Sequence, residues 1–411
     1  MRRRHVVHTV NNNKGNRFIL RRIAAVAALA ICIRGAWAIY PQAKDFLYTA
    51  TLVSAAMTVP DGAVELAKQR FEEELKEHSD DDISDSVPFE SSGTSSQQSS
   101  DDTQSQTQEE NPPESENTES ESEQDGFTVT PTPEAPSIDD IPEESRGVIA
   151  SRHYEASDGG VYIQYGSGII KNATNLSREA VQGYLNKPLE MTIADTDEPQ
   201  VLIMHTHATE SYYEYDAEYY DTRNAVWRNR DNEKNVVRVG QVIADELNKA
   251  GIVTLHDETQ HDYPSYNGSY ERSEETVKKY LEQYPSIKVV IDVHRDAIQA
   301  SDGTVYKAVS EINGEKTAQV MIIAGCDDGT MGMPEWDKNL RFAAALQSTM
   351  EENYPGLTRP VLFDYRKYNQ HLTNGSLLLE FGSHGNTLAE CERAAYYVAQ
   401  SLIKTLSALK K

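Results

Sequence analysis

Three apolar stretches of this sequence end in side chains that metal binding and proton transfer require. They are VLIMHTHATESY at 201–212, KVVIDVHRDA at 288–297 and LLLEFGSHGNT at 377–387. Histidines and acids gather where the first two apolar runs stop, and Glu380 lies at the end of the third. In parallel α/β sheets the carboxyl ends of the strands form the ligand crevice. We therefore expect these polar side chains to meet in one site.

The residue types in these stretches favour a catalytic zinc ion. Two imidazoles from different strands together with one carboxylate suit Zn²⁺, which keeps its fourth position open for water in a catalytic site. The metal lowers the pKa of that water towards neutrality. A further carboxylate that is not a ligand can take the proton and return it to a leaving nitrogen. Glu380 fits this last role, because an acid in an apolar strand is costly unless it is paired or functional.

Each of these residues also has a purely structural interpretation. A single histidine at a strand end is usually satisfied by hydrogen bonds, Asp292 and Asp296 could form an ion-pair knot with Arg295, and Glu380 could pair with a basic neighbour. Their joint occurrence on three strands favours the site. The sequence has neither an H-E-x-x-H nor a G-x-S-x-G motif. Its three cysteines are too few for a thiolate zinc site, so any metal must use histidine and carboxylate.

Strand and helix patterns alternate from about Gly147 onward. Apolar runs predict strands over 201–204, 289–293, 320–324 and 377–381. Helical spacing and stop signals predict helices over 235–250, 270–283, 338–353 and 387–409. We expect an α/β fold with a twisted, mostly parallel sheet and helices on both faces, in one catalytic domain over residues 147–411.

The charge of the chain is strongly negative and unevenly distributed. The formal net charge is −26, from 39 Lys and Arg against 65 Asp and Glu, which argues against nucleic acid as a partner. Residues 72–144 hold 24 acidic residues and one basic residue, Lys76. Such a segment has too little to bury to repay the entropy of ordering. Within residues 61–146 we expect a short helix over 61–77 and then an acidic, disordered linker.

The N-terminus has the composition of a membrane-targeting segment. Residues 1–22 contain seven basic residues and no acid, and IAAVAALAICIRGAWAIY at 23–40 is apolar except for Arg34. We expect a cytoplasmic leader over 1–22 and a single-pass membrane anchor region over 23–60, with the rest of the chain outside. The alternative is a signal peptide cleaved after Ala38, because Ala36-Trp37-Ala38 has the small-x-small form of a cleavage site.

Over roughly residues 198–405 the chain resembles the stage II sporulation protein P family. The resemblance is carried by HTHATESY, NVVRVG, HDETQHD, IDVHRDA, AQVMIIAG, YPGLTRP, YNQHL and LLLEFGSHGNT, in the order of that family. The family is in turn similar to the zinc N-acetylmuramoyl-L-alanine amidases of the cell wall. The resemblance therefore implies an amidase-like fold and a zinc cofactor.

Carried over by motif, the resemblance implies roles for three residues. His207, the second histidine of the H-T-H stretch, is expected to be the first zinc ligand. His294 in the D-x-H-R-D stretch is expected to be another. Glu380 in the L-L-L-E-F-G stretch is expected to be the catalytic glutamate.

The third zinc ligand is less narrowly defined. Related amidases place a glutamate at the start of a helix, in an E-K-x-V stretch, and the residues from Glu233 to Val236 match it. Glu233 is therefore the first expectation, followed by Asp231 and then Glu210. As a structural alternative, Glu233 is a first-turn acid that the helix dipole favours.

Substrate contacts are expected at Arg295, through the charged groups of a stem peptide, and at Asn369, as part of a cleft lining. His205 either orients a ligand or belongs to the core. The remaining candidates are histidines that we do not expect to be ligands: His256, His261, His371 and His384.

The implied activity is hydrolysis of the amide between N-acetylmuramic acid and L-alanine in peptidoglycan, during engulfment in spore formation. The resemblance also implies endopeptidase activity on cross-links and two partners, the wall hydrolase stage II sporulation protein D and a membrane scaffold protein. The expected location is the forespore or mother-cell membrane, with the catalytic domain on the wall side. Two other functions stay open: a wall-binding protein whose site has decayed, and a zinc hydrolase of another amide.

Overall fold

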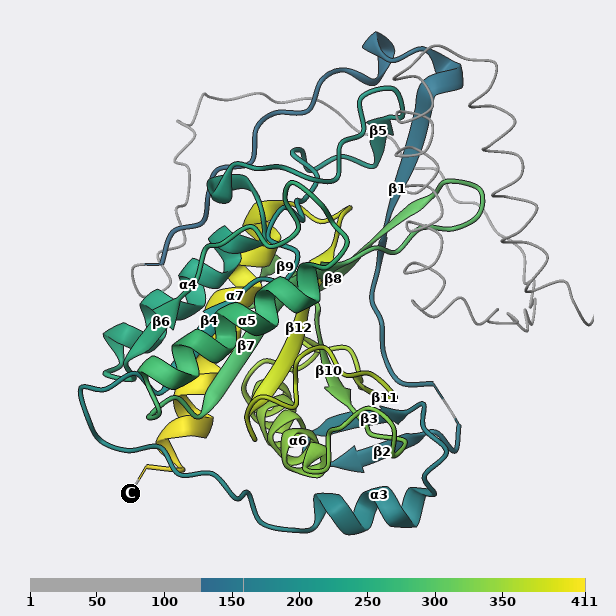
Figure 1. Ribbon diagram of the computed structural model, residues 1–411. Coiled ribbons are helices and arrows are strands. Elements are labelled where there is room, and N and C mark those ends of the chain that lie inside the picture. Colours follow the sequence, from purple (N-terminus) through teal and green to yellow (C-terminus); the bar gives the residue numbers. More distant parts are fainter. Residues whose placement is uncertain (1–126, 158, 411) are drawn as a thin grey trace, which may run out of the picture. The chain divides into compact units, whose positions relative to one another are not determined.

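The computed structural model describes residues 127–157 and 159–410, which form a mixed α/β fold (Figure 1). The strands are β1 (Arg146–Arg152), β2 (Tyr162–Tyr165), β3 (Gly168–Asn172), β4 (Val201–Met204), β5 (Tyr219–Asp221), β6 (Thr254–His256), β7 (Val289–Asp296), β8 (Val305–Ile312), β9 (Glu315–Ala318), β10 (Val320–Gly325), β11 (Val361–Asp364) and β12 (Ser376–Ser383). The α-helices are α3 (Arg178–Leu185), α4 (Val236–Lys249), α5 (Ser269–Gln283), α6 (Trp336–Asn353) and α7 (Leu388–Ser407). Short 3-10 turns are η1 (Ile138–Asp140), η2 (Glu143–Ser145) and η3 (Asn232–Lys234).

Within the described residues, the larger sheet has eight strands in the order β2-β3-β11-β10-β12-β7-β4-β6. Neighbouring strands are parallel except at β2–β3 and β10–β12. The three strands that lead into the predicted site are direct neighbours, β12-β7-β4, and run in the same direction. Their carboxyl ends therefore lie at one edge of the sheet, as the sequence predicts.

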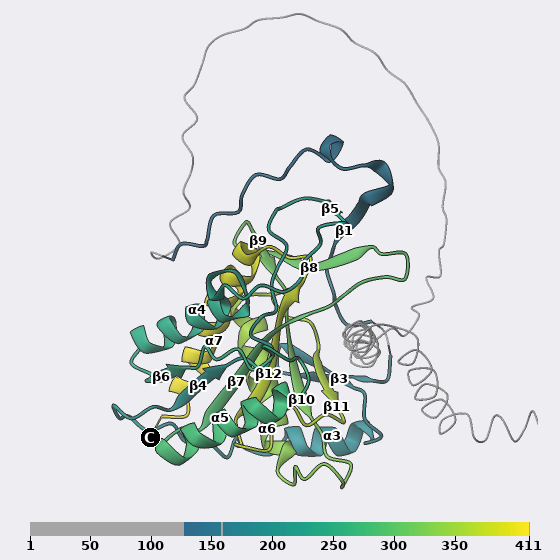
Figure 2. The ribbon, with the colours of Figure 1, turned by 45° about the horizontal axis from the view of Figure 1, so that its top comes forward.

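Helices cover both faces of this sheet, and the strand pattern explains why. Successive side chains of a strand point to opposite faces. In β4, Val201 and Ile203 join the core cluster that includes α4, α6 and α7, whereas Leu202 and Met204 pack with Val277 of α5. Helices α4 and α7 therefore share one face, and α5 covers the other (Figure 2).

A smaller sheet, β5-β1-β8-β9, supports the loop that follows β12. Asn386 in that loop accepts from the backbone N–H of Ala308 on β8 and donates back to its carbonyl, both at 3.1 Å. Helix α7 then starts at a capping box formed by Thr387 and Glu390. The buried Lys307 of β8 lies 2.8 Å from Glu390, which ties the helix start to the smaller sheet.

The four predicted strands and four predicted helices are all present, with ends displaced by at most three residues. The mostly parallel sheet with helices on both faces is confirmed. The other strands and α3 were not predicted, because they are short or carry mixed polar and apolar side chains.

The expected leader, anchor region and short helix, and almost all of the expected acidic linker, lie outside the described residues. Among residues 127–157 and 159–410, no helix has the combination of length and apolar character needed to cross a membrane.

The end of the expected linker packs on the folded domain. The ring of Phe127 stacks on Tyr396 of α7, with ring centroids 4.7 Å apart. Thr130 donates to the carboxylate of Glu392 from its backbone N at 2.5 Å and from its hydroxyl at 2.9 Å. Glu392 is fully buried, and Arg238 of α4 donates to it at 2.7 Å. Ordered contacts thus begin well before the domain boundary expected at residue 147.

We predict that a fragment beginning at residue 147 is less stable than one beginning at residue 127. The shorter fragment lacks Thr130, and a hydrogen bond to a charged group contributes about 1.5–3 kcal/mol. Denaturant titration should give a free energy of unfolding that is lower by roughly 2 kcal/mol. Thr130→Val in the longer fragment should lose part of this amount. Equal stability of the two fragments would show that the docked segment contributes nothing.

Candidate metal centre

His207, Glu210 and His294 lie together at the carboxyl end of the larger sheet. Met204 of β4 pairs with Asp292 of β7, so the turn that follows β4 starts beside the strand that carries His294. In this turn Glu210 donates from its backbone N to the carbonyl of His207 at 3.0 Å. One nitrogen or oxygen atom from each of the three side chains lies within 4.8 Å of the other two, and all three residues are buried.

Glu210 is placed between the two imidazoles. Its Oε1 lies 3.3 Å from Nδ1 of His207, and its Oε2 lies 3.3 Å from Nδ1 of His294. The two imidazole ring centroids are 5.0 Å apart. Two histidine nitrogens and a carboxylate are a donor set that catalytic zinc sites use. The residues present therefore fit Zn²⁺.

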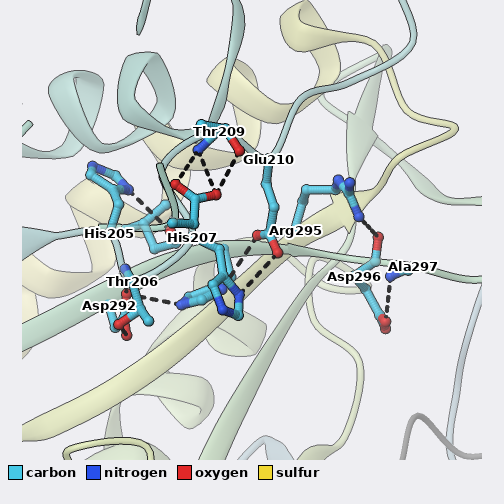
Figure 3. Close-up of polar contacts among 12 residues, drawn as sticks. His205, Thr206, His207, Thr209, Glu210, Asp292, Arg295, Asp296 and Ala297 are labelled. Atoms are coloured by element: carbon cyan, nitrogen blue, oxygen red, sulfur yellow. Dashed lines mark hydrogen bonds and ion pairs between the residues drawn. The ribbon is translucent and has the colours of Figure 1, made fainter. Parts of the chain in front are cut away.

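The nitrogen of each imidazole that faces away from Glu210 has its own polar neighbour. Nε2 of His294 lies 2.9 Å from Oδ1 of Asp292, and Nε2 of His207 lies 3.1 Å from the hydroxyl of Ser269 on α5. Asp292 accepts from the backbone N of Thr206 at 2.8 Å and from its hydroxyl at 2.6 Å (Figure 3). Outer partners of this kind fix the tautomer and the direction of a ligand imidazole. Both rings thus present Nδ1 to the centre of the cluster.

The charges of the three residues depend on each other. Burial disfavours the ionised form of Glu210, but His294 and His207 outweigh it and hold the pKa of this carboxyl well below its usual range. Burial also disfavours a charged His294, but Asp292 and Glu210 outweigh it and raise the pKa of His294 well above its usual value. Burial lowers the pKa of His207. The cluster thus combines a carboxylate with one imidazole that favours the charged form and one that favours the neutral form.

Glu380 of β12 pairs directly with His294 of β7 in the parallel register. A register shift follows Glu380, at Gly382, whose φ of +62° is one that glycine tolerates best. The Oε2 atom of Glu380 is buried and makes no hydrogen bond to any described residue. Burial, followed by the charge of Asp296, raises the pKa of Glu380 to about 8. A carboxyl group with such a pKa can accept and return a proton near neutral pH.

Glu233 and Asp231 lie outside the cluster. Both are exposed: Glu233 belongs to η3, and Asp231 caps this turn by accepting from the backbone N of Glu233 at 3.2 Å. Helix α4 begins only after this turn, with Asn235 as its N-cap. The structure places Glu210, the last of the three candidates, beside the two histidines, and it leaves Glu233 and Asp231 at the surface. The geometry therefore favours Glu210 as the third donor, and the identity of this ligand stays a proposal.

Arg295 and Asn369, the expected substrate contacts, both make internal hydrogen bonds. The buried Arg295 donates to the carbonyls of Ser211 at 3.0 Å and Trp227 at 2.8 Å. Asn369 donates to the carbonyl of Tyr270 at 2.9 Å. Both residues hold segments around the cluster in place, and their contact with substrate stays a prediction.

The ion-pair knot considered for Arg295 is not formed. Asp296 instead accepts from Arg359 at 2.6 Å, and Asp292 lies against His294. The joint interpretation of the three strand ends as one site is thus closer to the observed geometry than the separate structural interpretations.

Among the described residues, five further histidines lie outside the cluster: His205, for which two roles are open, and His256, His261, His371 and His384. His205 is fully buried and donates from Nδ1 to the carbonyl of Val293 at 3.0 Å, and its Nε2 lies 2.9 Å from Nε2 of His256. His261 donates to the carbonyl of His205 at 2.8 Å. These contacts support the backbone on which His207 is mounted.

Sequence reasoning missed the outer partners Asp292 and Ser269. Asp292 had a usable signal, because residues two apart in a strand share a face and the stretch D-x-H therefore puts Asp292 beside His294. Ser269 had none, since its position depends on how α5 packs over the sheet.

A family model described as "Stage II sporulation protein P (SpoIIP)" matches residues 59–403. The chain belongs to the stage II sporulation protein P family. It is similar to the Stage II sporulation protein P of Bacillus subtilis (strain 168), with 32% identity over 210 residues, which cover 48% of this chain and 49% of that protein. The match thus spans about half the length of this relative.

Solved structures with partial similarity include two amidases. The N-acetylmuramoyl-L-alanine amidase AmiC2 of Nostoc punctiforme is 11% identical, with a TM-score of 0.30, over 51% of this chain and 96% of that one. The CwlD amidase of Clostridioides difficile, in complex with the GerS lipoprotein, is 11% identical, with a TM-score of 0.32, over 51% and 99%.

We predict that Glu210→Gln weakens zinc binding by at least about 100-fold, because it removes a charged donor from the cluster. The matched variant Glu233→Gln should bind zinc as tightly as the unchanged chain, because Glu233 is exposed on η3. Competition with a chromogenic chelator measures both affinities. If only the Glu233→Gln variant loses zinc affinity, Glu233 and not Glu210 is the third ligand.

We predict that ionisation of Glu380 makes the metal-free protein less stable as the pH rises from about 4.5 to about 8. The folded state holds this proton more tightly than the unfolded state, so stability falls with pH across this window. Glu380→Gln should therefore gain stability relative to the unchanged chain at pH 8 but not at pH 4.5, by roughly 1.4 kcal/mol per unit of pKa difference. Denaturant unfolding with a chelator present tests this, with Glu282→Gln on the exposed side of α5 as the control.

Proposed function

We propose that this chain is a zinc-dependent peptidoglycan hydrolase that cleaves the amide between N-acetylmuramic acid and L-alanine. One observation carries the proposal: a buried His-Glu-His cluster has a separate glutamate, Glu380, paired in register with one of its histidines. Membership of a sporulation family supports the biological setting. Against the decayed-site alternative stands the fact that every residue type that the reaction needs is present in the cluster and at Glu380.

His207, Glu210 and His294 would hold the zinc ion. When bound, zinc supplies Lewis acidity, which makes water acidic near neutral pH and polarises a carbonyl oxygen. Asp292 holds His294 from behind, and Ser269 does the same for His207. The backbone N of Arg295 donates to Oε2 of Glu210 at 3.2 Å, which orients this carboxylate. The three donors are therefore arranged before the metal arrives, which reduces the cost of binding it.

Glu380 is the proposed general base and then general acid. Its carboxylate accepts a proton from the attacking water, and the resulting carboxylic acid returns the proton to the nitrogen of the leaving L-alanine. The buried, unbonded Oε2 and the pKa of about 8 support this role, because such a group holds a proton without being locked by a partner.

We further propose that residues 23–60 anchor the chain in the forespore or mother-cell membrane, with the catalytic domain on the wall side. The apolar run and its basic flank support this orientation. Family membership supports the wall hydrolase stage II sporulation protein D and a membrane scaffold protein as partners, and endopeptidase activity as a second reaction.

The test is mass spectrometry of the soluble products after the zinc-loaded, full-length chain digests isolated peptidoglycan. We predict stem peptides with a free N-terminal L-alanine, and a turnover that is lower by about 100-fold or more in Glu380→Gln, which should still bind zinc. Glu282→Gln serves as the matched control and should retain full turnover.

Cleavage at another amide, with an intact lactyl–alanine bond, would contradict the proposed specificity. Intact peptidoglycan in the presence of bound zinc would contradict an autonomous enzyme. A second digest would then include a glycan hydrolase that degrades glycan strands without stem peptides. Cleavage only in this digest would indicate an enzyme that depends on a partner, and no cleavage would indicate a binding protein.

A further inference from the structure

A cavity of about 800 Å³ lies beside the metal centre. Its walls come from the segment that follows Glu210, from the docked segment 130–141 and from the start of α7. We call it the aromatic cavity, because its lining includes Tyr213, Tyr215, Tyr219, Tyr220 and Trp227. Pockets that hold small ligands have volumes of about 300–1,000 Å³ and favour aromatic linings. The proposed reaction leaves this cavity without a role.

The aromatic cavity and the metal centre share structural elements. Arg228 lines the cavity, and its guanidinium lies 3.9 Å from Oε1 of Glu210. Ser211 and Trp227 also line it, and both carbonyls accept from Arg295, the residue after His294. One strand end therefore positions both a candidate metal ligand and a wall of the cavity. An extended substrate with one bond at the metal centre would reach into the cavity.

The polar groups of the aromatic cavity suit a neutral, hydroxyl-rich ligand. Arg228 donates to Asp262 at 2.8 Å, so part of its charge is neutralised. The charged lining consists of four acids and two bases: Asp140, Glu214, Asp221, Glu233, Arg228 and Lys234. Carboxylates accept hydrogen bonds from hydroxyl and amide groups, and aromatic faces pack against apolar C–H surfaces. Asp221 is paired with Arg223 at 2.6 Å, so the negative charge of the lining comes mainly from Asp140, Glu214 and Glu233. This charge disfavours an anionic peptide.

The aromatic rings are held in place by the protein itself. Tyr213 donates from its hydroxyl to the carbonyl of Tyr219 at 2.9 Å, and Tyr220 donates to the carbonyl of Gly303 at 3.0 Å. The ring of Trp227 lies edge-on to His384, with ring centroids 4.7 Å apart. Because these rings are already ordered, a ligand that packs on them pays little for fixing side chains.

We propose that the aromatic cavity binds the N-acetylated glycan strand of the substrate, next to the amide that is cleaved at the metal centre. This inference rests on the proposed function for the position of the cleaved bond. It adds a direction to the substrate: the sugars lie on the side of Trp227 and the docked segment 130–141, and the stem peptide leaves the site elsewhere.

The test measures binding of peptide-free tetra-N-acetylchitotetraose to the full-length chain by calorimetry and by the fluorescence of tryptophan. Tyr215 is the residue to change, because it lines the cavity and its ring contacts Tyr213 edge-on rather than the core. Tyr215→Ala should weaken binding by about tenfold, and Tyr215→Phe should largely retain it. Tyr263→Ala is the matched control, since Tyr263 is an exposed tyrosine outside the cavity.

The outcomes separate this inference from the proposed function, because sugar binding requires neither zinc nor cleavage. The glycan subsite is supported if the unchanged chain and the Tyr263→Ala variant bind the sugar saturably and the Tyr215→Ala variant does not. This holds even if no amide is cleaved. Absence of saturable binding up to roughly 10 mM sugar, or equal loss in the Tyr263 control, overturns it, even if the amidase reaction is observed. Binding of a free stem peptide in place of the sugar, with the same dependence on Tyr215, would assign the cavity to the peptide and also overturn it.

Discussion

The parallel pairing of β7 with both of its neighbours is the constraint on which the site depends. One pairing sets Met204 beside Asp292, and the other sets Glu380 beside His294. A slip of one residue in either pairing would turn a side chain of the site to the opposite face. The register is secured by apolar residues on the other face of β7, where Val289, Ile291 and Val293 are completely buried. The apolar core on one face of the sheet thus fixes the positions of the candidate site residues on the other face.

The second feature of the site is buried charge, and neighbouring groups compensate the free energy of removing it from water. Removing a charge from water is expensive unless a partner and hydrogen bonds replace the solvent. Glu210, His294 and Asp292 are all buried, and each lies against at least one of the others. Thr206 and Arg295 add donors from the backbone. Two buried atoms of the site make no hydrogen bond to a described residue: Oε2 of Glu380, and Nε2 of His294, which lies 2.9 Å from Asp292 as an ion-pair contact.

Much of the fold and part of the site could be predicted from the sequence. Long apolar runs and amphipathic helices are local signals, and they identified the central strands and the helices that flank them. The adjacent positions of His207, His294 and Glu380 followed from the strand ends and a family resemblance, while their roles stay proposals. The choice between Glu210 and Glu233 could not be made in this way, because it depends on the path of the chain after β4. The tight turn over 207–210 brings Glu210 back to His207, and the 3-10 turn η3 leaves Glu233 at the surface.

The contacts of Phe127 and Thr130 have a mechanical consequence. They attach the end of the acidic stretch to α7, whose first turn follows the loop after Glu380. The same stretch of chain supplies a wall of the aromatic cavity. A load applied to the chain before residue 127 would therefore be borne first by α7 and the cavity wall, and not by the central sheet. Any displacement of residues 127–141 would therefore move a wall of the aromatic cavity before it reached the strands that carry His294 and Glu380.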